Sequence, residues 1–149
     1  MDRDDRAFSL MDDAATIAAI VRRVPAERLA EIAFADWTWL ALIGHVADTA
    51  ELFAERVRRC IEESDPSFPD RDTDAWVRER RGSRDAAECA ARIAAEHMRI
   101  VRLLDGPGAP ERTGAHSTHG RVTAGWLADY QVRHSREHVR ELQAAFPPG

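Results

Sequence analysis

The residues of this sequence that are best suited to chemistry are histidines, and two of them share one short segment. In the stretch YQVRHSREHVREL, His134 and His138 are four residues apart. Residues at this spacing lie on the same side of an α-helix, with Cβ atoms about 5–6 Å apart. Each neutral imidazole offers one nitrogen lone pair, so such a pair can bind a divalent metal ion. The spacing predicts either a shared ligand or two histidines packed in a core.

A third histidine, His45, is predicted to face the same interior. It lies three residues after Leu42 and four before Thr49, on the buried face of its own helix. In the last helix the inward series is Leu127, Gln131, His134, His138 and Leu142. Burying several imidazoles costs free energy unless their nitrogens have partners, and one metal ion satisfies a nitrogen on each. The pattern alone leaves a metal site and a set of hydrogen-bonded core histidines both open.

Four long amphipathic segments must position these side chains. Apolar residues recur at intervals of three and four, and strand-like alternation is nearly absent. The predicted helices span approximately residues 8–24, 38–63, 84–104 and 123–145. Thr38 and Ser83 are predicted N-caps, and Pro25 ends the first helix. The predicted fold class is therefore all-α, a four-helix bundle with long connections in one domain, residues 1–149.

Smaller features complete the predicted fold. The third helix is expected to bury Ala87, Ala91, Ala94, Met98, Val101 and Leu104. The stretch SDPSFPDRDTD is predicted to be a loop and DAWVRERR a short helix, and the loop before the last helix contains His116 and His119. His97 and the four tryptophans are predicted to be structural. The arginines of RERRGSR are expected on a solvated helix surface.

Composition excludes several classes of function. The chain has 149 residues, 44% of them hydrophobic, which is enough for a core without a metal or a disulfide. A net charge of −5 disfavours binding to nucleic acid. No secretory signal is apparent, and the apolar runs are shorter than the roughly 18 residues of a membrane span. We therefore expect a cytoplasmic protein that binds neither nucleic acid nor membrane, with Cys60 and Cys89 as reduced packing residues.

Three stretches, WTWLALIGHVADTAELFAER, ERTGAHSTHGRVT and HSREH, together resemble the DinB/YfiT-like family over nearly the whole chain. This family consists of four-helix-bundle proteins regarded as metal-dependent enzymes. By position, the resemblance implies that His45, His134 and His138 bind a divalent metal, Zn²⁺ or Ni²⁺. Ser135 stands where relatives often have aspartate, and Ala50 where many have glutamate. These two departures put a carboxylate-assisted mechanism in doubt but leave the ligands intact.

The segment HSREH also matches the His-x-x-Glu-His pattern of inverted zinc peptidases, in which the glutamate is the general base. Such enzymes need a further ligand downstream. Only eleven residues follow His138, and Glu141 among them is too near on the same helix. Glu137 is therefore predicted to be a surface residue beside Arg133 or Arg140.

The resemblance implies a site that activates water or a low-molecular-weight thiol against a small molecule, in a homodimer. The protein would then be a hydrolase or a thiol-dependent S-transferase. The alternative is a non-catalytic, stress-related metal-binding protein that acts through interactions. An open pocket at the metal favours catalysis, whereas a closed pocket or a fourth protein ligand favours the alternative.

Four further residues are candidates for catalysis. His116 and His119 would orient a substrate or transfer protons. Arg56, at the family-like arginine position, would hold an anionic group, and Asp48 would support an imidazole N–H. The competing interpretations are exposed loop histidines, a surface ion pair at Arg56 and a surface carboxylate at Asp48.

Overall fold

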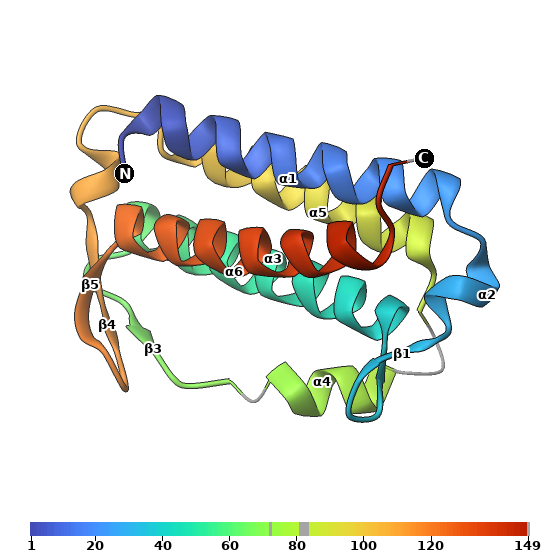
Figure 1. Cartoon of the computed structure of the whole chain (residues 1–149). Helices are drawn as coiled ribbons and strands as arrows, with labels where there is room; N and C mark the ends of the chain where they lie inside the picture. Colours follow the sequence, from blue (N-terminus) through green and yellow to red (C-terminus); the bar gives the residue numbers. More distant parts are fainter. Residues whose placement is uncertain (72, 81–83, 149) are drawn as a thin grey trace.

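Four long helices form the body of the protein in the computed structural model, which describes residues 1–71, 73–80 and 84–148 (Figure 1). They are α1 (Arg3–Arg23), α3 (Trp39–Glu62), α5 (Ala86–Leu103) and α6 (Ala124–Ala145). Contacts join α1 to α5 and α6, and α3 to the same two helices. The predicted four-helix bundle is therefore present, and α3 and α6 pack directly against each other.

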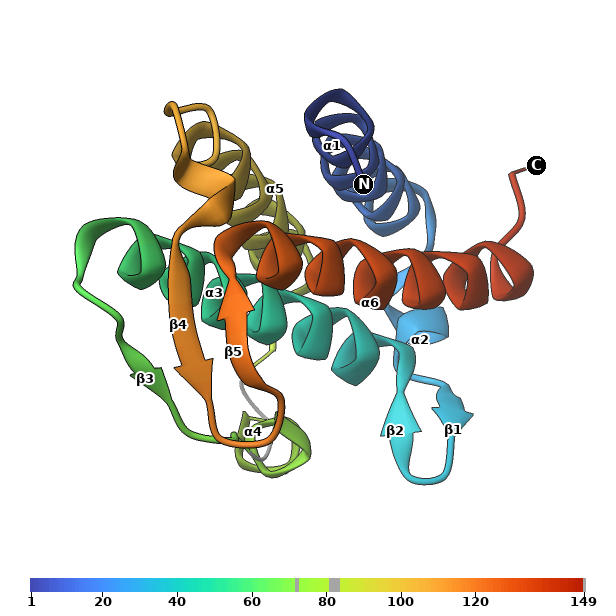
Figure 2. The same cartoon turned by 90° about the vertical axis from the view of Figure 1, so that its left-hand side faces the viewer.

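The connections hold shorter elements. The helices among them are α2 (Ala26–Leu29), α4 (Thr73–Arg80) and the 3₁₀ helix η2 (Ala109–Glu111). An antiparallel pair is formed by β1 (Ile32–Phe34) and β2 (Trp37–Thr38). A second sheet joins β3 (Ser67–Phe68), β4 (Thr113–His116) and β5 (Gly120–Thr123), with β3 parallel and β5 antiparallel to β4. In Figures 1 and 2, both sheets and α4 lie beyond α3 and α6, on the side away from α1 and α5.

The sheets show that the prediction of a strictly all-α fold was incomplete. The predicted loop around His116 and His119 is a hairpin, with Gly120 in the left-handed region at φ 70°. Strands of two to four residues are too short for an alternating pattern to be recognised. They form here because β3 and the hairpin, far apart in sequence, complete each other's hydrogen bonds.

Side-chain caps fix where the long helices begin. Thr38 Oγ1 accepts a hydrogen bond from Ala41 N at 3.0 Å, which confirms this predicted cap, and Thr123 caps α6 in the same way. α5 begins two residues later than predicted, after Asp85. The predicted cap Ser83 lies outside the described residues. α1 begins earlier than predicted because Asp2 caps a first turn that has no apolar stripe.

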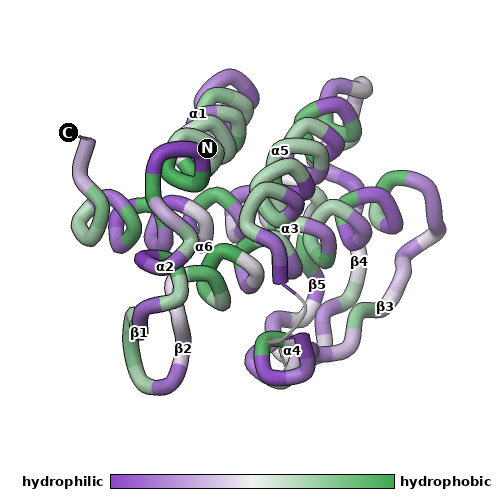
Figure 3. Tube along the Cα trace, turned by 90° about the vertical axis from the view of Figure 1, so that its right-hand side faces the viewer, coloured by the Kyte–Doolittle hydropathy of each residue, from purple (hydrophilic) through white to green (hydrophobic). Residues whose placement is uncertain are grey.

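The buried face of α5 differs from the predicted one. Its buried residues are Cys89, Ala90, Ile93, His97 and Ile100. Ala87 and Ala91 are exposed instead. Alanines occur on several sides of this helix, so their spacing did not identify one face, and the two isoleucines with the larger apolar areas lie inward. Figure 3 shows hydrophobic and hydrophilic residues alternating along the long helices, as amphipathic packing requires.

The predictions that Cys60 and Cys89 are packing residues and that Trp37 and Trp39 are structural are confirmed. Cys60 and Cys89 are buried free thiols. Among the described residues, no helix is both long and apolar enough to cross a membrane. Trp37 is buried, and Trp39 packs edge-on against Phe146.

His97 is a core histidine whose two nitrogens both have partners. Its side chain has no exposed surface. The Leu10 carbonyl can only accept, so His97 Nδ1 donates to it at 2.7 Å. Nε2 then accepts from the Gln131 amide at 3.0 Å. Burial lowers the pKa of His97 to about 4, so the ring is neutral at pH 7.

This neutral ring predicts a loss of stability in acid. An unfolded histidine titrates near pH 6.5, so protons bind the unfolded chain first as the pH falls from 6.5 toward 4. The contribution of His97 is fully present above this range, and it decreases by up to about 1.4 kcal/mol per pH unit within it. In His97→Asn, the free energy of unfolding should therefore depend less steeply on pH. Urea unfolding at several pH values, with chelator present, tests this, and parallel slopes for the two proteins would contradict it.

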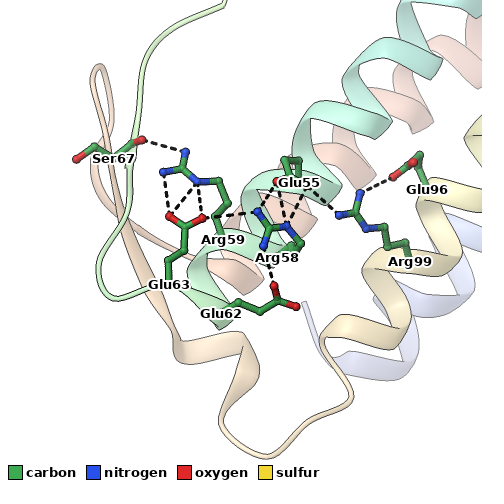
Figure 4. Close-up of polar contacts among 8 residues, drawn as sticks. All are labelled: Glu55, Arg58, Arg59, Glu62, Glu63, Ser67, Glu96 and Arg99. Carbon is green, nitrogen blue, oxygen red and sulfur yellow. Dashed lines mark hydrogen bonds and ion pairs between the residues drawn. The ribbon is translucent and has the colours of Figure 1, made fainter.

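The second half of α3 carries a ladder of exposed ion pairs (Figure 4). Arg58 contacts Glu62 at 2.7 Å, and Arg99 from α5 contacts Glu55 at 2.8 Å. Hydrogen bonds from Arg58 and Arg99 lower the pKa of Glu55 to about 2. Exposed pairs of this kind contribute roughly 0–1 kcal/mol each. The ladder therefore joins α3 to α5 without being a major source of stability.

Candidate metal centre

α3 and α6 bring three imidazoles to one point. His134 Nε2 lies 3.0 Å from His45 Nε2 and 3.2 Å from His138 Nε2. One nitrogen from each ring lies within 4.8 Å of those of the other two. His45 is buried, and the two histidines of α6 are half-buried. Among the described residues, these three histidines are the ligand-type side chains grouped closely enough to share one ion.

The hydrogen bonds around the cluster fix two of the tautomers. Thr49 Oγ1 uses its single proton toward the Val46 carbonyl, so it accepts from His134 Nδ1 at 3.1 Å. The Glu141 carboxylate can only accept, so His138 Nδ1 donates to it at 3.3 Å. Both rings therefore carry their proton on Nδ1. This leaves the Nε2 lone pairs of His134 and His138 facing each other.

This donor set fits a divalent metal ion. Two lone pairs at 3.2 Å repel each other unless a cation lies between them. The spacing is close to the roughly 3.3 Å between two nitrogens bound to a tetrahedral ion with bonds of about 2.0–2.1 Å. Hydrogen bonds from Nδ1 to neighbouring oxygens are the usual way in which proteins orient metal-binding histidines.

The protonation state of the rings also suits a metal. Burial, together with a smaller effect of the neighbouring imidazoles, lowers the pKa of His45 to about 4 and that of His134 to about 3. Both rings are therefore neutral at pH 7, as metal binding requires. His45 Nδ1 is buried and has no hydrogen-bond partner among the described residues.

A cavity of about 240 Å³ opens beside the histidines. Its wall includes His45 and His134 at the cluster, Arg56 further along α3, and His116 and His119 from the hairpin. Thr73 and Asp74 from α4 also line it. The irregular connections seen on one side of the bundle in Figure 2 therefore build the outer wall of this cavity.

The hairpin places its two histidines differently. His116 has a side-chain exposure of 8%, so the exposed-loop interpretation is wrong for this residue. Its Nδ1 accepts from the backbone amides of Thr118 and His119 at 3.0 and 3.3 Å, so its Nε2 carries the proton. Burial, with contributions from Arg56 and His119, lowers the pKa of His116. His119 is exposed and packs against Trp126, with 5.1 Å between ring centroids.

Asp48 is buried among arginines, so the surface interpretation is wrong for it. Its carboxylate contacts Arg80 at 2.7 Å, Arg84 at 2.6 Å and Arg92 at 2.8 Å. Among the described residues, no hydrogen bond joins Asp48 to an imidazole. Gly44 makes the cluster possible, because a Cβ there would lie 2.6 Å from Arg84 Nε. The predicted solvated surface is therefore wrong for Arg84.

The structure also shows the surroundings of four other residues that the sequence singled out. Arg56 is buried and hydrogen-bonded to the Pro69 carbonyl at 2.5 Å, so a surface ion pair is excluded for it. Ser135 donates to Asp13 Oδ2 on α1 at 2.8 Å, and Ala50 is fully buried. Glu137 is exposed, as predicted.

The sequence model of the DinB superfamily matches residues 10–142, and the chain belongs to this superfamily. Among solved structures, it is similar to YfiT from Bacillus subtilis, which is described as a probable metal-dependent hydrolase with an unusual four-helix bundle topology. The TM-score is 0.85 at 20% identity, and the match covers 96% of this chain and 85% of YfiT. This likeness shows a shared fold. No curated protein is significantly similar in sequence.

Proposed function

We propose that this protein is a metal-dependent enzyme that binds one divalent ion, Zn²⁺ or Ni²⁺, on His45, His134 and His138. The observation that carries the proposal is the convergence of three Nε2 atoms beside an open cavity, whose wall includes two of the three histidines. The description of YfiT as a probable metal-dependent hydrolase supports the same class of function.

The ion would supply Lewis acidity, which lowers the pKa of a coordinated water or thiol toward neutrality. The side chains around it would prepare the site. Thr49 and Glu141 hold His134 and His138 in the tautomers that present Nε2. His119, at the exposed side of the cavity, would exchange protons with solvent, and His116 would orient the substrate through its Nε2 proton.

Asp48 would contribute indirectly. Of its three arginine partners, Arg80 belongs to α4, Arg84 precedes α5 and Arg92 belongs to α5. The ion pairs therefore join these segments to α3, about one turn from His45. We infer that Asp48 positions α4, whose first residues line the cavity. It is thus a positioning residue and not a partner of the substrate.

The non-catalytic alternative has less support. A structural metal site is closed by four protein ligands, whereas a catalytic site keeps a position for a reactant. Among the described residues, the cluster of possible ligands consists of three histidines, and the cavity reaches His45 and His134. A small-molecule substrate fits a cavity of this size. The homodimer, the cytoplasmic location and the absence of nucleic-acid binding remain predictions from the sequence.

Turnover assays test the proposed function. The metal-loaded protein should transfer a low-molecular-weight thiol to an electrophile or hydrolyse an ester or amide, and chelation should abolish the reaction. Transfer that requires the thiol would assign an S-transferase, and reaction with water alone would assign a hydrolase. A protein that binds metal stoichiometrically yet turns over neither class would instead support the interaction function.

A further inference from the structure

Arg56 is a buried cation with no ion-pair partner among the described residues. Its residue exposure is 6%. Among the described residues, no carboxylate lies within 4.0 Å of its guanidinium, and one of its N–H groups donates to the Pro69 carbonyl. Burying a charge without a counter-ion is costly, so such arginines are rare unless a ligand completes them.

The surroundings hold this guanidinium in place. Its central carbon lies 5.8 Å from the Phe53 ring centroid and 5.6 Å from that of Phe68. Cation–π contacts at these distances favour the charged form and restrict its motion. Arg56 also lines the cavity that reaches His45 and His134 of the cluster. Its position is therefore fixed at the wall of the candidate site, whereas a surface arginine would move freely.

A second donor faces the same cavity. The backbone amides at Thr118 and His119 occupy His116 Nδ1, which leaves Nε2–H as a donor. Asp70 lies 3.8 Å from this nitrogen, too far for a hydrogen bond, and accepts instead from Thr118 at 2.5 Å. Arg56 and His116 thus present N–H groups to the cavity, and one of them carries a full charge.

The wall between this region and the histidines is aromatic. Phe53 and Tyr130 are stacked with 5.0 Å between centroids, and Trp126 lies 5.5 Å from Tyr130. Along α3, Arg56 is eleven residues beyond His45, a rise of about 16 Å between Cα atoms. A ligand that reaches both regions needs an apolar body with the anionic group at one end.

The geometry points to a carboxylate-binding subsite at Arg56 and His116, which selects small carboxylic acids with an aromatic or apolar body as substrates. A single planar carboxylate matches the guanidinium fork and one neutral imidazole donor. A doubly charged phosphate would fit less well, because Asp70 and Asp74 also line the cavity and Arg71 offsets only one of these two negative charges. This inference names a substrate class for the enzyme proposed above and rests on that proposal, but binding is measurable without turnover.

Calorimetry on chelator-treated protein tests the subsite with benzoate as the probe. Benzoate should bind, and the neutral isostere benzamide and inorganic phosphate should bind at least about tenfold more weakly. Arg56→Gln should weaken benzoate binding at least about tenfold. Arg56→Lys should weaken it by a smaller factor, because lysine keeps the positive charge but lacks the guanidinium fork. The matched control is Arg59→Gln, which removes the same charge from α3 outside the cavity and should leave the affinity unchanged.

The outcomes separate this inference from the proposed function. Equal binding of benzoate and benzamide overturns the subsite even if a variant fails to fold. Equal losses in Arg56→Gln and Arg59→Gln would show a general effect of charge, and tighter binding of phosphate would overturn the substrate class. Zinc binding to Arg56→Gln at wild-type affinity, together with lost benzoate binding, would place the anion subsite apart from the metal centre. Benzoate binding by a protein that binds no metal would retain the subsite and refute the enzyme proposal.

Discussion

His134→Ala is expected to weaken zinc binding by more than about a hundredfold. His134 Nε2 is the nitrogen that contacts both other imidazoles, so its removal takes away the central one of the three ligands. Even the outer partners of metal ligands are worth about 10–100-fold in affinity, and a direct ligand should exceed that range. His138→Ala should act in the same direction. Competition with a chromophoric chelator measures the affinity.

The control for these variants lies on the same helix. Glu137 is one residue from His138 but its side chain is exposed and belongs neither to the histidine cluster nor to the cavity wall, so Glu137→Gln should bind zinc as the wild type does. Peptide hydrolysis by the same variant tests the inverted-peptidase hypothesis, because such an enzyme requires Glu137 as general base. Unchanged zinc affinity in both histidine variants would refute the proposed centre.

Asp48→Asn is expected to lower the free energy of unfolding by about 3–5 kcal/mol. The substitution keeps the shape of the side chain but removes the negative charge shared by three guanidiniums. Because Asp48 has no exposed surface, water cannot replace that charge. Urea denaturation, with the slope checked for constancy, measures the loss.

A charge change of the same kind on the surface provides the comparison. Glu62 belongs to the exposed ladder of Figure 4 and contacts Arg58, so Glu62→Gln should change stability by only about 0–1 kcal/mol. A loss below about 1 kcal/mol in Asp48→Asn would show that the arginines find other partners. In that case, Asp48 would not be the residue that positions α4.

The parts of this structure that local sequence patterns control were predicted well. Thr38 caps α3, and apolar spacing over twenty or more residues identified the inward faces of α3 and α6. His45 and the α6 pair were placed on those faces by the same spacing. That they meet at their Nε2 atoms depends on how α3 packs on α6, which no local pattern specifies.

The errors arose where contacts between segments distant in sequence determine which residues are buried and which strands pair. Asp48 was predicted to be either a partner of an imidazole or a surface carboxylate, and its arginine partners were missed because they are 32 to 44 residues away in sequence. Arg84 was assigned to a solvated surface for the same reason, although Gly44 was a signal that a side chain crosses α3 there. The hairpin that carries His116 was missed because its strands are short and one of them, β4, pairs with the distant strand β3.

One of the two residues that depart from the family pattern, Ser135, has a buried structural partner. Ser135 donates to buried Asp13 on α1, and Arg136 contacts the other oxygen of that carboxylate at 3.0 Å. Burial raises the pKa of Asp13. A carboxylate is therefore present near this turn of α6, but it comes from α1 and joins two helices. Its partners give no support to a role in chemistry at the three histidines.

The most direct measurement is anomalous diffraction at the zinc edge from crystals of the zinc-loaded protein. Our account predicts one strong peak per chain, about 2.0–2.1 Å from Nε2 of His45, His134 and His138, with the cavity side of the ion free of protein ligands. A peak bound elsewhere, or imidazoles that hydrogen-bond to one another with no peak between them, would contradict it.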